Sequence, residues 1–66
     1  MEKLHHIAIV VDNLLNQTDM YCKIYNAKKI GEIFIDTNQA VKVQFIKSNY
    51  IMIELLEPLN NKSPIS

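Results

Sequence analysis

The chain has 66 residues, 48% of them hydrophobic and 21% charged, so it is too short for two domains and too apolar to stay disordered. Seven basic side chains balance seven acidic ones, which leaves no basic surface to hold a nucleic acid. There is one cysteine, no run of the roughly 20 apolar residues that span a membrane, and no signal-peptide pattern. We therefore expect a cytoplasmic protein with no membrane or nucleic acid partner.

The pattern along the chain predicts one strand, one helix and three further strands. Residues 4–11 are rich in β-branched side chains and precede Asp12 and Asn13, either of which suits the N-cap of a helix. The apolar spacing becomes helical over residues 13–25, and Asn26 tolerates the left-handed conformation that ends many helices. Turn-forming residues then separate three β-type segments, at residues 28–35, 40–47 and 50–57.

Two details refine this prediction. Gly31 within a strand indicates a bulge, and Ser48-Asn49 suits a two-residue hairpin connection. We expect an α+β fold over residues 1–58: a single βαβββ module, with one helix on one face of a four-stranded mixed sheet. Residues 59–66 are expected to form a C-terminal tail.

One helix can cover only one face of such a sheet. We expect the covered face to carry nine apolar residues: Ile7, Ile9, Val11, Val41, Val43, Phe45, Ile51, Ile53 and Leu55. The opposite face would carry five more, together with two polar ones: Leu4, Ala8, Val10, Met52, Leu56, His6 and Glu54. A surface this apolar is not left in water by a monomer, so we expect something else to cover it.

His6 and Glu54 are lone polar residues within apolar strands. A buried carboxylate is costly unless it is paired or binds a metal, and imidazole with carboxylate suits a divalent ion such as Zn, Co, Ni, Mn or Fe. The alternative is structural: His6 hydrogen-bonds a backbone carbonyl, and Glu54 pairs with Lys42 or with a neighbouring chain. The residue pattern leaves both open.

Other chemistry-bearing residues have simpler interpretations. A single glycine excludes a glycine-rich phosphate loop and a dinucleotide fingerprint. Cys22 has no neighbouring histidine in the sequence and is interpreted as a small buried thiol. Glu57, just before Pro58, is interpreted as a solvated strand end.

Three segments carry a resemblance to a known family. Residues 4–14 (LHHIAIVVDNL), with Tyr21 in the helix that follows, resemble the opening of the vicinal oxygen chelate superfamily, which includes glyoxalase I, bleomycin-resistance proteins and extradiol dioxygenases. Residues 39–45 (QAVKVQF) and 53–59 (IELLEPL), with the SPI at 63–65, resemble the methylmalonyl-CoA epimerase family within it. The resemblance runs the length of the chain and is looser through the helix.

The resemblance implies that the chain is half of a glyoxalase-type fold, in which two βαβββ modules share a metal site and each supplies a His from its first strand and a Glu or Gln from its fourth. His6 and Glu54 match the ligands of the first module, and Glu54 is also the candidate catalytic base. The epimerases' acid/base glutamates have no counterpart at Lys42, Val43 or Gln44. The chain ends at Ser66, so we expect the other ligands to come from a second copy in a homodimer or from a complementary second module.

The activity that the resemblance implies is metal-assisted α-proton transfer on a small-molecule substrate, an acyl-CoA or a 2-oxo compound. Such an enzyme would be an epimerase, another isomerase or a lyase. Two alternatives stay open. The chain could be a truncated product without activity, or a metal-free module that binds a small apolar ligand.

Overall fold

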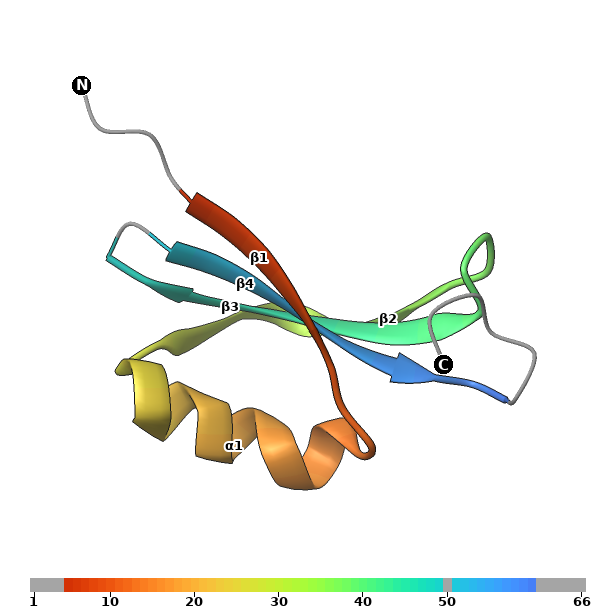
Figure 1. The fold of residues 1–66 in the computed structure, drawn as a ribbon, viewed down its shortest axis with the longest axis horizontal. Coiled ribbons are helices and arrows are strands. Elements are labelled where there is room, and N and C mark those ends of the chain that lie inside the picture. The colour runs from red at the N-terminus through yellow and green to blue at the C-terminus, as the bar shows by residue number, and fades with distance from the viewer. Residues whose placement is uncertain (1–4, 50, 61–66) are drawn as a thin grey trace.

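A computed structural model describes residues 5–49 and 51–60 of the chain (Figure 1). The elements are β1 (His5–Val10), α1 (Leu14–Tyr25), β2 (Lys28–Asp36), β3 (Val41–Ser48) and β4 (Ile51–Pro58). The predicted order is confirmed, and no described end differs from its prediction by more than one residue. Leu4 and the tail beyond residue 60 lie outside the described residues.

The four strands form one mixed sheet in the order β1-β4-β3-β2. The first strand pairs in parallel with the last, while β3 pairs antiparallel with both β4 and β2. Figure 1 shows α1 lying along one side of the sheet, so the predicted α+β module is confirmed. The strands β1 and β2 are the two edges. The described part of the chain has no helix with the length and apolar content needed to cross a membrane.

Both ends of α1 use the asparagines that the sequence indicated. The Asn13 side chain accepts a hydrogen bond from the Asn16 backbone N–H at 3.0 Å, which satisfies one of the first-turn amides. At the other end Asn26 is left-handed, with φ 52° and ψ 50°. The chain can then turn, and the Ala27 N–H donates to the Cys22 carbonyl at 2.8 Å.

The main core lies between α1 and the sheet. Its buried residues come from four segments: Val11, Leu14, Ile46, Ile53 and Leu55. The helix contributes Tyr21, Cys22 and Tyr25 at its margin, whereas Ile24 is 62% exposed. Ile24 therefore does not face the sheet. The helix packs through the stripe on which Leu14 and Thr18 are buried.

The sequence assigned β3 to the wrong face. Val43 pairs with Leu56 and Phe45 pairs with Glu54, and paired residues of neighbouring strands point to the same side of a sheet. Val41, Val43 and Phe45 therefore lie opposite α1, where the first two are buried with Leu56 in a second cluster. On β3 the side that faces the helix carries Lys42, Gln44 and Ile46. We call the side away from α1 the open face.

Gly31 forms the expected bulge. It has a φ of 68°, and the pairing of β2 with β3 changes register between Ile30 and Phe34. The side-chain N–H₂ of Gln44, which is buried, donates to the carbonyls of Ile30, Gly31 and Phe45 at 3.3, 3.2 and 2.9 Å. The Gln44 side chain on β3 thus holds the bulge of β2 in place.

The last hairpin is displaced by one residue from its prediction. Ser48 pairs with Ile51, so the connection begins at Asn49 and not at Ser48. Asn49 has a φ of 41°, a conformation that asparagine adopts at lower cost than most residues.

Ala40 holds a strained backbone conformation at the start of β3. Its φ is 53°, in the left-handed region that a Cβ atom disfavours. We expect Ala40→Gly to raise the free energy of unfolding by about 0.5–1 kcal/mol, because the relief of strain exceeds the added chain entropy of glycine. Urea denaturation measures it. Ala27→Gly, at a position not held in this conformation, should lower stability; equal losses for the two variants would contradict the assignment.

Candidate functional site

His6 and Glu54 lie on the open face, on adjacent strands. The parallel register pairs His6 with Met52 and Ala8 with Glu54. Alternate residues of a strand share a face, so the two polar side chains occupy diagonal positions on one surface. The structure therefore brings the two predicted ligands together from opposite ends of the chain. Their role as ligands stays a prediction.

Aromatic and aliphatic side chains surround this pair. The ring of His6 lies 6.1 Å from that of Phe45, and Phe45 stacks on Phe34 with centroids 6.0 Å apart. Phe45 is also the cross-strand neighbour of Glu54. His6 is exposed and Glu54 is half-buried. Both could reach an ion or a ligand placed against the face, next to a largely apolar wall.

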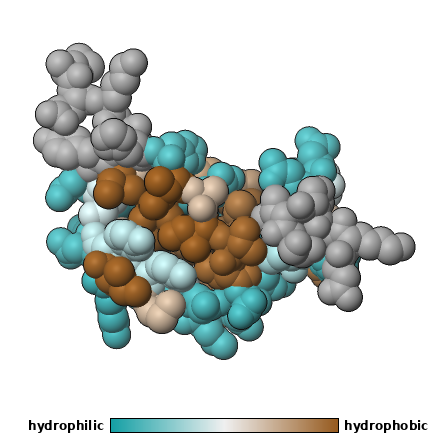
Figure 2. All heavy atoms as spheres, in the orientation of Figure 1, coloured by the Kyte–Doolittle hydropathy of each residue, from teal (hydrophilic) through white to brown (hydrophobic). Residues whose placement is uncertain are grey.

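The apolar character continues to the β1 edge. Val10, on the open face, is 50% exposed, and Ile7, on the side of α1, is 41% exposed. From the side on which β1 lies in front, hydrophobic residues gather across the middle of the molecule (Figure 2). A monomer rarely presents so large a contiguous apolar surface to water.

The open face supplies two candidate ligands, which is fewer than a metal site needs. Protein sites for zinc use three or four ligands, and among the described residues no three His, Cys, Asp or Glu side chains gather into a metal-binding group. One imidazole and one carboxylate from adjacent strands are the right kinds of donor. They fit such an ion only if further ligands come from elsewhere.

One structural alternative for Glu54 is wrong. Lys42 lies on the face that α1 covers, and its Nζ is 3.9 Å from Glu57, its cross-strand neighbour. A pair between Glu54 and Lys42 would have to pass through the sheet.

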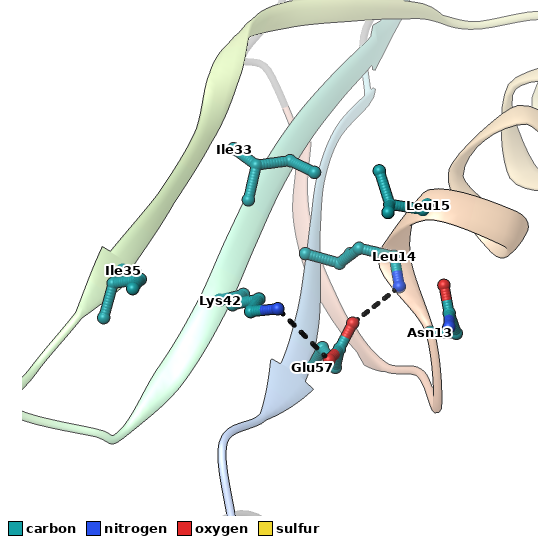
Figure 3. A pocket seen from close by; sticks show the side chains of 7 residues that line it. All are labelled: Asn13, Leu14, Leu15, Ile33, Ile35, Lys42 and Glu57. Carbon is teal, nitrogen blue, oxygen red and sulfur yellow. Dashed lines mark hydrogen bonds and ion pairs between the residues drawn. The ribbon is translucent and has the colours of Figure 1, made fainter.

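Glu57 is not the solvated strand end that the sequence suggested. One carboxylate oxygen accepts the Leu14 backbone N–H at 2.8 Å, and the other faces Lys42 (Figure 3). The first turn of α1 contains no acidic side chain of its own, so Glu57 supplies the negative charge that a helix N-terminus favours. It ties the start of α1 to the end of β4.

A pocket of about 310 Å³ lies beside this contact, on the side opposite His6 and Glu54. Two α1 residues and two β2 residues line its walls, with polar groups at one end (Figure 3): Leu14, Leu15, Ile33, Ile35, Asn13, Lys42 and Glu57. Sequence reasoning missed it. The available signal was the repeated isoleucine of β2, because the isoleucines that follow the bulge lie on the helix side.

Cys22 packs at the margin of the main core and is half-buried, whereas the sequence predicted a buried thiol. Burial raises the pKa of the Cys22 thiol, and Asp19 raises it further while Lys29 opposes the shift. The Nζ of Lys29 is 3.2 Å from the Asp19 carboxylate, so the two charges largely offset each other. The neutral thiol is favoured, which does not suit a nucleophile.

Comparison with known proteins identifies relatives over nearly the whole chain. A sequence profile of the glyoxalase/bleomycin resistance protein/dioxygenase superfamily matches residues 5–66. The mitochondrial methylmalonyl-CoA epimerase of Dictyostelium discoideum is 35% identical over 63 residues, which cover 96% of this chain and 37% of the epimerase.

Solved structures share the fold. Hypothetical protein BH1468 from Bacillus halodurans C-125 matches with a TM-score of 0.80 and 36% identity, over 96% of this chain and 45% of that one. Methylmalonyl-CoA epimerase from Mycobacterium tuberculosis also has a TM-score of 0.80, at 22% identity, over 96% of this chain and 43% of that one. This chain spans less than half the length of each relative.

Proposed function

The chain belongs to the glyoxalase/bleomycin resistance protein/dioxygenase superfamily, and we propose that it forms one half of a metal-assisted epimerase site. The observation that carries this proposal is the placement of His6 and Glu54, on one surface of adjacent strands. The other half would come from a second βαβββ module. That module is either a second copy of this chain or a separate complementary chain.

The apolar surface around the pair supports the need for a partner. Val10, Ile30 and Phe34 on the open face are 50%, 43% and 46% exposed. A second module placed against this face would bury them and enclose the space in front of Glu54. Excluding water there strengthens the electrostatic interactions of the site.

His6 and Glu54 would hold the divalent ion from this side, and a partner module would hold it from the other. Such an ion, when bound, stabilises negative charge on a substrate carbonyl oxygen. The substrate class is an acyl-CoA, which the relationship to methylmalonyl-CoA epimerase supports, or alternatively a 2-oxo compound.

Glu54 is the candidate base. Epimerisation requires that the α C–H bond break, that a base accept the proton, and that a proton return to the opposite face of the same carbon. In a homodimer, the Glu54 carboxylate of one copy would hold the ion while that of the other accepted the α-proton, and a water molecule on the opposite face of the carbon would return a proton to it. Phe34 and Phe45 would separate the substrate from bulk water.

A second candidate is a metal-free module that binds a small apolar ligand. The row of rings from His6 through Phe45 to Phe34 favours it, because aromatic faces bind apolar ligands without any charge. In that case the ligand would bind equally well after Glu54→Gln, since the carboxylate would have no essential part.

Metal titration followed by native mass spectrometry separates the two candidates. We expect the wild-type chain to bind one Zn²⁺, Co²⁺ or Mn²⁺ per pair of modules, with binding and pairing increasing together. His6→Ala and Glu54→Gln should each weaken binding by at least about tenfold, because each removes one of a small set of ligands. Glu57→Gln is the matched control, since it makes the same carboxylate-to-amide change on the opposite face.

Binding of one ion per single chain that survives His6→Ala would contradict the proposal. Exchange of the α-proton of methylmalonyl-CoA in D₂O, followed by NMR, then tests the chemistry. We expect exchange from a metal-loaded pair of modules and none after Glu54→Gln. Unchanged exchange in that variant would remove Glu54 from the role of base.

A further inference from the structure

The edge strand β2 is unusually exposed for so apolar a segment. Eight of its nine residues are exposed, and the large apolar ones stay 37% to 57% exposed. They lie on both sides of the sheet. Ile30 and Phe34 are on the open face, whereas Ile33 and Ile35 line the pocket beside α1 (Figure 3). A long apolar edge strand with unpaired backbone groups is a template for pairing with another strand.

The sequence of β2 is complementary to itself when it is reversed. An antiparallel pairing of two copies centred on Glu32 sets Lys28 opposite Asp36, Ile30 opposite Phe34 and Gly31 opposite Ile33. The faces agree as well. Lys28 pairs with Lys47 and Asp36 pairs with Val41 in the β2–β3 register, so both lie on the open face. Lys28 meets the opposite charge of Asp36 and Ile30 meets Phe34, whereas Lys29 faces Ile35.

We propose that β2 is a self-association surface, along which the β2 strands of two copies pair antiparallel about a two-fold axis at Glu32. The pairing would join two sheets into one. The regular stretch before the bulge in one copy would meet the regular stretch after the bulge in the other. This surface lies at the opposite edge of the sheet from β1, and the inference does not depend on the proposed function.

The charges at Lys28 point to a second copy as the occupant. Lys28 sits directly beside Lys47 on the same face, and in the described part of the chain it forms no ion pair. Asp36 of a second copy would bring a negative charge next to these two cations. Opposite charges at facing positions of an antiparallel pair stabilise it.

The position opposite Ile33 also suits a second copy of the chain. Gly31 lacks a side chain, and a Cβ atom added there would have no neighbour within 4 Å. The Ile33 side chain of a second copy would enter this open space. Two contacts do not favour the pairing: Lys29 faces the apolar Ile35, and on the axis Glu32 faces its own copy, where like charges repel.

Sedimentation velocity over a range of protein concentrations, at low salt, tests the proposal. A chelator in the buffer prevents any pairing of two copies through a metal ion. We expect a reversible dimer in the wild type. Glu32→Gln should tighten it about two- to fivefold, because it removes the facing like charges. Lys28→Glu should weaken it by about tenfold, because it turns two attractive pairs into repulsive ones. Lys28→Glu also places a carboxylate beside Lys47, so the monomer stays folded.

Lys23→Glu is the control: it makes the same charge reversal on exposed α1 and should leave the dimer unchanged. A wild type and a Glu32→Gln variant that both stay monomeric up to millimolar concentration would overturn the proposal. Equal effects of Lys28→Glu and Lys23→Glu would do the same. A dimer that responds to His6→Ala and not to Glu32→Gln would place the contact on the open face and also overturn it.

Cross-linking tests the register directly. Facing residues of an antiparallel pair have Cα atoms about 4.5–5.5 Å apart, within the range of a disulfide. In a Cys22→Ser background, Glu32→Cys should oxidise readily to a linked dimer, because the two thiols meet on the axis. Lys47→Cys, one strand inward, should not. Equal linking at both positions would refute the register.

Discussion

Leu55→Ala should lower the free energy of unfolding by about 2–5 kcal/mol, the usual cost of emptying a fully buried leucine site. Leu55 is 0% exposed and lies in the main core between α1 and the sheet. Typical stabilities of about 0.05–0.15 kcal/mol per residue give a domain of this size only about 3–10 kcal/mol in total. The variant should therefore be unfolded in a large fraction of molecules at 25 °C.

Urea denaturation followed by circular dichroism measures this loss. Leu15→Ala is the matched control, since the same change is made at a residue that is 79% exposed. We expect it to shift stability by no more than about 0.5 kcal/mol. Similar losses in the two variants would show that the core is not where the structure places it.

Gln44→Leu should cost about 1–3 kcal/mol although it increases the apolar content of the sheet. The Gln44 side chain is buried and donates to three backbone carbonyls, two of them in the bulge of β2. Leucine fills a similar volume but donates nothing, so those carbonyls lose a partner while they stay partly shielded from water. We expect β2 to loosen first, visible as faster amide hydrogen exchange at its residues.

Gln44→Glu provides a pH-dependent version of the same test. An ionised carboxylate only accepts hydrogen bonds, so at neutral pH this variant should be less stable than Gln44→Leu. Near pH 4 or below, protonation returns one O–H donor, and the difference between the two variants should shrink or reverse. A difference that stays constant between pH 7 and pH 4 would contradict a donating role for residue 44.

The elements were predictable because their ends carry local signals. Asn13 and Asn26 have side chains or backbone preferences that act within a few residues, and each performs the expected role. Gly31 is equally local, since its positive φ and the change of register occur at the same place. Local signals of this kind need no knowledge of what packs against the element.

The face of β3 was not predicted correctly, although the sequence contained the means to do so. Val41, Val43 and Phe45 were assigned to the helix because they are the apolar side of a clean alternation. A two-residue connection, whichever two residues form it, sets odd-numbered positions of β3 opposite even-numbered positions of β4. That arithmetic puts Val43 and Phe45 with Glu54 and away from Ile53. The error arose because this module has an apolar surface on both sides, so polarity alone does not identify the covered one.

The contacts of Glu57 and the pocket beside α1 could not be predicted from the sequence. The hydrogen bond from Leu14 to Glu57 joins residues 43 positions apart. Its existence depends on how far the start of α1 sits from the end of β4, which is a property of the packed layers. The placement of His6 and Glu54 on one face was predictable in part. It follows from which residues of each strand share a face, together with membership of a family in which β1 and β4 are neighbours.

The pairing of β1 with β4 means that the two candidate donors come from the first and the fourth strand of the module. His6 emerges from the ribosome before β4 does, so no partial chain lacking β4 can present both side chains. An ion or ligand that needs both would therefore bind only chains in which all four strands are present, and its binding energy would be added to the whole module rather than to one hairpin. Removing β4 would remove Glu54 together with Ile53 and Leu55 of the main core.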